Sequence, residues 1–276
     1  MQNLGQILFV MWRETVEAML VVGILHAWLA REPSGARGRL YLWSGVLAGL
    51  VGAVLLGLGI DAINSVLSDD GQEYFRAGML LAASALIVQM VLWMRQHGRR
   101  LKQDMERSLS ESARNQHWWG VFSLAAIAVA REGSETVVFL SSLATGSDGF
   151  ASRQFWLAVA LGAALAGATF YLLQLGGKRI SWRAFFMVTE ILLLLLGCAL
   201  LVGGAEKLMD VQLLPTLKSQ VWDSSLLLDD GSITGGIVSA FTGYRSRPTL
   251  MSLLVFGGYW LVIFGVTRRA KVPQRT

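Results

Sequence analysis

Long apolar segments constrain this sequence more than any other feature. Several stretches of about twenty residues carry almost no charge, which is the length that an α-helix needs to cross the hydrocarbon core of a bilayer. Hydrophobic residues make up 54% of the chain and charged residues 16%, whereas soluble domains are nearer to about 25% charged. The sequence therefore predicts an all-α integral membrane protein and excludes the disordered and coiled-coil classes. Cys198 is the single cysteine, which excludes an internal disulfide and a cluster of thiolate metal ligands.

Seven segments have the length and apolarity of transmembrane helices. They are residues 4–28, 40–60, 77–94, 118–144, 155–175, 184–204 and 249–267. Most of the 24 lysine and arginine residues follow the first, third and fifth segments or lie in the C-terminal tail. Because basic residues accumulate in cytoplasmic loops, we predict that the N-terminus is outside and the C-terminus is cytoplasmic. The net charge of +5 thus reports topology and does not indicate nucleic-acid binding.

The predicted outer loops are acidic, both between the second and third segments and in the long loop at residues 206–248. A solvated surface explains these acids, and a cation-attracting surface or a docking site for an outside partner is the alternative. Within the long loop, the glycine-rich stretch 232–243 is expected to dip into the membrane or to lie on it. Small residues at four-residue spacing in the second and fifth segments predict close helix packing. They are Gly45, Gly49, Ala158, Gly162 and Ala166.

Two segments carry charged residues near their middle, in the same R-E-x-x-E arrangement. The first copy consists of Arg13, Glu14 and Glu17, and the second of Arg131, Glu132 and Glu135. Each charge at the centre of a membrane helix costs roughly 2.5–3.5 kcal/mol on insertion scales. A chain that carries this cost in two places is expected to use the charges.

The spacing within each copy determines which groups can act together. Residues three or four apart share one face of a helix, so the two glutamates of each copy project together. Arg13 can pair with Glu17 in the same way, and Arg131 with Glu135. Two facing copies would offer four carboxylates, an oxygen-rich site that suits a hard cation. The alternative is a structural lattice between the helices, Arg13 with Glu135 and Arg131 with Glu17, which leaves the other two acids unpaired.

The two copies are three segments apart, so the helices that bear them cross the membrane in opposite directions. We therefore predict a single membrane domain, residues 1–276, that contains an inverted repeat. Its halves are residues 1–96 and 117–205, and residues 206–276 supply the outer loop and the seventh span. Inverted repeats place their substrate site between the halves near the midplane, where both motifs lie.

Glu190 is a further acid within an apolar segment. It lies a few residues into the sixth segment, nearer to the predicted cytoplasmic side than the two motifs. An intramembrane acid at that depth is a candidate exit site or proton site. The alternative is an ion pair with a basic residue at the inner boundary, such as Arg183.

The doubled motif in the first and fourth of seven segments resembles the oxidase-linked high-affinity iron permease family of fungi and bacteria, of the Ftr/EfeU type. The similarity extends to Trp93-Met94-Arg95, to the run from Arg131 to Leu140, and to Thr242-Gly243-Tyr244, so it covers essentially the whole chain. The sequence departs from the family inside each motif. Thr15-Val16 and Gly133-Ser134 stand where a Gly-Leu pair is more familiar.

This resemblance implies an iron permease of the bacterial inner membrane rather than an enzyme. The iron ligands would be Glu14, Glu17, Glu132 and Glu135, with Arg13 and Arg131 as their charge partners. Iron would be the transported substrate, with no permanently bound cofactor. Ferric iron, delivered after oxidation of ferrous iron, is the expected form, and ferrous iron is the alternative.

The resemblance also implies a separate periplasmic oxidase or iron-binding partner protein, while a homo-oligomer stays open. The same carboxylates would equally serve a broader divalent-metal carrier or a proton-coupled cation carrier. A membrane scaffold that uses the motifs only as salt bridges is the structural alternative.

Overall fold

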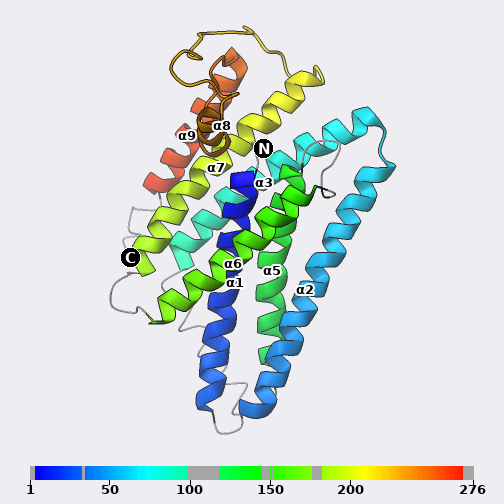
Figure 1. The fold of residues 1–276 in the computed structure, drawn as a ribbon, viewed down its shortest axis with the longest axis vertical. Helices are drawn as coiled ribbons and strands as arrows, with labels where there is room; N and C mark the ends of the chain where they lie inside the picture. The colour runs from blue at the N-terminus through cyan, green and yellow to red at the C-terminus, as the bar shows by residue number, and fades with distance from the viewer. Residues whose placement is uncertain are drawn as a thin grey trace. The chain divides into compact units, whose positions relative to one another are not determined.

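The computed structural model describes residues 4–32, 35–97, 118–144, 150, 152–175 and 182–269. Within these ranges the chain is helical and has no β-strand, which confirms the predicted all-α class. Most of the basic residues used for the predicted topology, in 98–117, 176–181 and 270–276, lie outside the described residues. The helices are α1 (Leu4–Arg31), α2 (Gly35–Val66), α3 (Asp69–His97), α5 (Trp119–Leu143), α6 (Arg153–Leu175), α7 (Trp182–Asp210), α8 (Ile233–Thr242) and α9 (Leu250–Arg269) (Figure 1).

Seven of these helices coincide with the seven predicted segments, and the short α8 lies in the predicted outer loop. Five of them, α2, α3, α6, α7 and α9, contain stretches long and apolar enough to cross a bilayer. The other two, α1 and α5, have 28 and 25 residues and carry the two charged motifs. Their length is therefore sufficient for a membrane span, and the motif charges set them apart from the other five.

The chain divides into two compact units. The motif unit contains α1 from Ile7 onward, α2, α5 and α6, together with Met94 at the end of α3. The loop unit contains most of α3, α7, α8 and α9, and the first residues of α1. Each unit therefore takes helices from both of the predicted repeats.

In the motif unit, glycines bring helix backbones into close contact. A Cβ atom at Gly49 of α2 would lie 2.9 Å from the carbonyl oxygen of Ala126 on α5. A Cβ atom at Gly162 of α6 would lie 2.7 Å from the carbonyl oxygen of Leu8 on α1. Because only glycine fits at such distances, the structure confirms the packing role predicted for these two residues.

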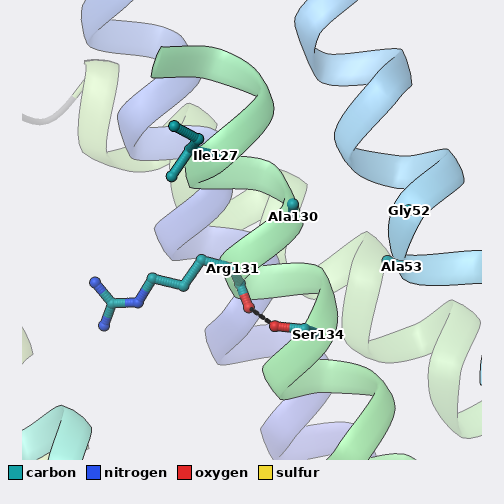
Figure 2. A pocket seen from close by; sticks show the side chains of 6 residues that line it. All are labelled: Gly52, Ala53, Ile127, Ala130, Arg131 and Ser134. Carbon is teal, nitrogen blue, oxygen red and sulfur yellow. Dashed lines mark hydrogen bonds between the residues drawn. The ribbon is translucent and has the colours of Figure 1, made fainter. Parts of the chain in front are cut away.

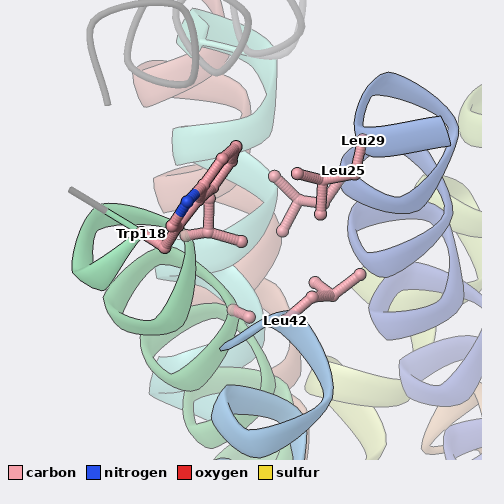
Figure 3. Packing of buried hydrophobic residues seen from close by; sticks show 6 residues of the cluster. Leu25, Leu29, Leu42 and Trp118 are labelled. Atoms are coloured by element: carbon pink, nitrogen blue, oxygen red, sulfur yellow. The ribbon is translucent and has the colours of Figure 1, made fainter. Parts of the chain in front are cut away.

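At one end of the motif unit, an apolar cluster connects α1, α2 and the start of α5. Leu25 and Leu29 of α1 and Leu42 of α2 gather around Trp118, which directly precedes α5 (Figure 3). Ala125 completes the buried set together with Val121. This contact between three helices holds α1 and α5, the two motif-bearing helices, in one packed body.

In the loop unit, buried hydroxyl groups connect the helices. Ser84 of α3 donates to the carbonyl oxygen of Gly197 on α7 at 2.7 Å, and Tyr259 of α9 donates to that of Leu194 at 2.8 Å. Both α8 and α9 pack against α7. The helix begins after Ser232, whose hydroxyl accepts from the amide of Gly235, and ends at Gly243 in the left-handed conformation, with φ of 73°. The predicted glycine-rich stretch is thus a short helix packed against α7.

Candidate metal site

The first motif is tightly held in the middle of α1. The guanidinium of Arg13 donates from Nη1 to Glu14 Oε1 at 2.7 Å and forms an ion pair with Glu17. Its Nη2 also contacts the sulfur of Met94 at 3.4 Å. Arg13 and Glu14 are each only 1% exposed, so this charged group is enclosed by protein.

The second motif lies in the middle of α5, and its arginine is more exposed than that of the first. Arg131 Nε donates to Glu135 Oε1 at 3.1 Å and lies 4.0 Å from Glu132 Oε1. The side chain of Arg131 is 36% exposed, while Glu132 and Glu135 are buried. The two arginines therefore have different surroundings, although their motifs have the same letters.

Carboxylates from both motifs meet inside the motif unit. Glu14, Glu132 and Glu135 each offer one oxygen, and these three oxygens all lie within 4.8 Å of one another. The second oxygen, Oε2, of each of these glutamates is buried without a hydrogen-bond partner. Buried carboxylate oxygens without partners are costly, and a cation between them would satisfy them. An all-oxygen, anionic donor set of this kind suits a hard metal ion.

The structure brings together three of the four predicted ligands in this cluster. Glu17 is engaged by Arg13 instead, at the i,i+4 spacing that the sequence indicated, and it is 15% exposed. The corresponding pair in the second motif, Arg131 with Glu135, has the same spacing, so both predicted pairs within a helix are confirmed. Glu190 lies on α7 in the loop unit, where it is half-buried.

Two contacts beside the first motif were not predicted. One is the contact between the sulfur of Met94 and the guanidinium of Arg13. It could not be predicted because methionines in an apolar helix usually only fill space in the packing. The other is the indole of Trp12, which donates to the hydroxyl of Thr169 on α6 at 3.0 Å. Both depend on how the helices are rotated against each other, which the sequence pattern does not specify.

Four acids of the predicted outer loops, Glu73, Glu206, Asp210 and Asp223, form ion pairs within the loop unit. Arg245 binds Glu206 with two hydrogen bonds, at 2.7 and 2.6 Å, and Lys207 lies 3.2 Å from Glu73. Asp223 accepts from the hydroxyl and the amide of Ser225, which lowers the pKa of its carboxyl group. These contacts fit the interpretation of a solvated surface.

Sequence comparisons relate the chain to proteins of known type. The sequence model of the iron permease FTR1 family matches residues 4–268. Ferrous iron permease EfeU of Shigella sonnei and that of Escherichia coli O157:H7 are each 31% identical over 270 residues, covering 95% of both chains. Ferrous iron permease EfeU of Yersinia pestis is 26% identical over 250 residues, which cover 90% of this chain and 87% of the relative. No solved structure matches the chain.

Proposed function

This chain belongs to the iron permease FTR1 family, and we propose from this membership that it imports iron through the cluster of Glu14, Glu132 and Glu135. With its family and its apolar helices, it is a multi-pass membrane protein. The observation that carries the proposed site is the convergence of three buried carboxylates whose second oxygens have no partner. Glu17 would be a fourth ligand, recruited when Arg13 releases it.

The form of iron follows from the donor set and the relatives together. The relatives are named for ferrous iron, and we propose that ferrous iron is the form supplied to this protein as well. Carboxylates are hard ligands, so ferric iron, formed by oxidation at the outer face, would be the ion that enters the site. Its inward movement would gain roughly 7 kcal/mol per 100 mV of inside-negative potential, from about 2.3 kcal/mol per charge.

An inverted repeat with seven spans is the architecture that supports this function best. The close contact at Gly49 involves Ala126, Val129 and Ala130, and the close contact at Gly162 involves Leu8, Met11 and Trp12. Leu8, Met11 and Trp12 precede Glu14 by the same numbers of residues as Ala126, Val129 and Ala130 precede Glu132. The pair α2 and α5 thus repeats the pair α6 and α1 in matching register, as expected of an inverted repeat.

The remaining parts of the proposal concern the surroundings of the site. Residues 1–276 would form one membrane domain of the inner membrane, with the N-terminus outside and the C-terminus cytoplasmic. Glu190 would serve as an exit or proton site for the ion. A separate periplasmic oxidase or iron-binding protein would deliver the iron to the outer face.

Uptake of radioactive iron into vesicles that contain the purified protein tests this function. We expect uptake from the wild type and a loss of uptake from Glu132→Gln. Asp210→Asn, which changes an exposed acid at the end of α7, should transport normally and serves as the matched control. Competition by excess manganese, zinc or copper distinguishes an iron permease from a general metal carrier. Equal uptake by the wild type and Glu132→Gln would contradict the proposed site.

A further inference from the structure

A hollow of about 520 Å³, open to the outside of the protein, lies beside the second motif between α2 and α5. Gly52 and Ala53 of α2 line one side, and Ile127, Ala130, Arg131 and Ser134 of α5 line the other. Figure 2 shows Ala130 and Ser134 on the side of α5 that faces α2, while the guanidinium of Arg131 points away from α2. The hydroxyl of Ser134 donates to the carbonyl oxygen of Arg131 at 2.8 Å, so its hydrogen-bond partner lies within α5.

The matching register of the two helix pairs identifies the counterparts of this lining in the other half. Trp12 corresponds to Ala130, Phe9 to Ile127, and Leu165 of α6 to Gly52. Two of the small residues that line the hollow, Ala130 and Gly52, therefore correspond to large residues in the other half, Trp12 and Leu165. Trp12 also packs against Phe9, with ring centroids 5.8 Å apart, and its indole bonds to Thr169 of α6.

The contact between α2 and α5 is of a kind that permits rolling. It is made over Gly45, Gly49 and Gly133, where a Cβ at Gly133 would lie 2.6 Å from that of Ala53. At Gly45 and Gly49 the backbone of α5 lies directly against α2, so no α2 side chain interlocks with α5 at these two positions. On α1 and α6, the same kind of contact at Gly162 is reinforced by the hydrogen bond from Trp12 to Thr169.

From these differences we infer that the two motifs have separate roles in transport: α1 is the fixed half of the site and α5 is the moving half. Trp12 and Thr169 are positioning residues that hold the first motif, and its ligand Glu14, against α6. During transport α5 rolls on its glycine contact into the hollow, and its two ligands, Glu132 and Glu135, leave Glu14 and release the ion. This inference rests on the proposed iron permease function.

Filling the hollow tests the inference. The variant Gly52→Leu with Ala130→Trp places on α2 and α5 the residues found at the corresponding positions of α6 and α1, Leu165 and Trp12. A Cβ at Gly52 has no atom within 4 Å, so the larger side chain enters open space. Gly59→Leu is the matched control, because Gly59 is also on α2, also has open space around it, and does not line the hollow.

Two measurements on purified protein separate binding from movement. Equilibrium binding of radioactive iron in detergent should stay within about threefold of the wild type, since the three carboxylates are unchanged. Uptake into vesicles should fall at least about tenfold, because a conformational step that precedes release limits the overall rate. Gly59→Leu should match the wild type in both measurements. Wild-type uptake by the filled variant, or a parallel loss of binding and uptake, would overturn the inference.

A cleavable cross-link between α2 and α5 tests the inference even if the variant with the filled hollow does not fold. The variant Gly52→Cys with Ala130→Cys, in a Cys198→Ser background, is cross-linked with a cleavable bifunctional thiol reagent. Uptake should stop after cross-linking and return after cleavage, while iron binding persists throughout. Undiminished uptake by the cross-linked protein would refute the moving role of α5. Failure of the wild type itself to take up iron would instead refute the proposed function.

Discussion

Replacing Glu132 by glutamine should stabilise the empty protein while it weakens iron binding. One oxygen of Glu132 lies within 4.8 Å of oxygens of both Glu14 and Glu135, and Arg131 Nε is 4.0 Å away. With these groups ionised and an effective dielectric constant of about 20, each carboxylate repels Glu132 by roughly 3.5 kcal/mol and the arginine attracts it by about 4 kcal/mol. Removing the charge therefore relieves about 3 kcal/mol of net repulsion in the empty site.

The same substitution removes a charge that a bound ion needs. An ion placed among the three oxygens would lie about 3 Å from each, where a carboxylate attracts each unit of positive charge by roughly 5 kcal/mol at that dielectric constant. The amide oxygen of glutamine recovers part of this attraction as a neutral ligand. We expect a net loss of at least about 3 kcal/mol, which is roughly a hundredfold loss of iron affinity.

Both quantities can be measured on one preparation. Thermal unfolding in detergent with a chelator gives the stability of the empty protein, and equilibrium binding of radioactive iron gives the affinity. Glu132→Gln should melt at a higher temperature than the wild type and bind iron more weakly. Asp210→Asn should leave both values unchanged. A lower melting temperature together with unchanged iron affinity would refute the reasoning, because it would make Glu132 a structural partner and not a ligand.

Substitutions at three further residues test other parts of the proposal. Arg13→Lys should keep more uptake than Arg13→Ala, since the charge beside Glu14 survives without the fork geometry; equal uptake by both at equal expression would contradict this. Trp12→Phe should lower the free energy of unfolding by about 0.6 kcal/mol, the mean for a hydrogen bond between membrane helices, and an unchanged value would remove Thr169 as a partner. Glu190→Gln should bind iron from outside normally but release it slowly inside, whereas normal transport with a lower melting temperature would assign Glu190 to structure.

Much of the candidate site follows from spacing along the chain. The three- and four-residue intervals of each motif fix which acids share a helix face, and they correctly predict the pairs Arg13 with Glu17 and Arg131 with Glu135. The intervals do not say how far each helix is rotated toward the other. That rotation places Glu14 in the cluster and leaves Glu17 with Arg13, so the grouping of three acids emerges only in the folded chain.

The helices were predictable for a similar reason, and their contacts only in part. Uninterrupted apolar segments of sufficient length leave a chain in lipid little choice but the helix, because every backbone group must be satisfied internally. Small residues at four-residue spacing indicated close approach at Gly49 and Gly162, but they did not name the partner helices. The short α8 had its own signals, a serine before the helix and a glycine after it, which are typical of helix ends.

The contrast between the motifs shows what duplication alone cannot provide. Two identical halves would hold an ion between equivalent ligands, and no feature of the site would favour the movement of one half over the other. Here Arg13 is enclosed at 1% exposure beside the packed Trp12, while Arg131 is 36% exposed beside a hollow lined by Ala130. In the inference above, the first copy is the fixed half because Trp12 bonds to Thr169 of α6, and the second copy moves because the hollow lies beside it. We therefore propose that the duplicated residues form the site and that the residues that differ between the copies determine how it opens.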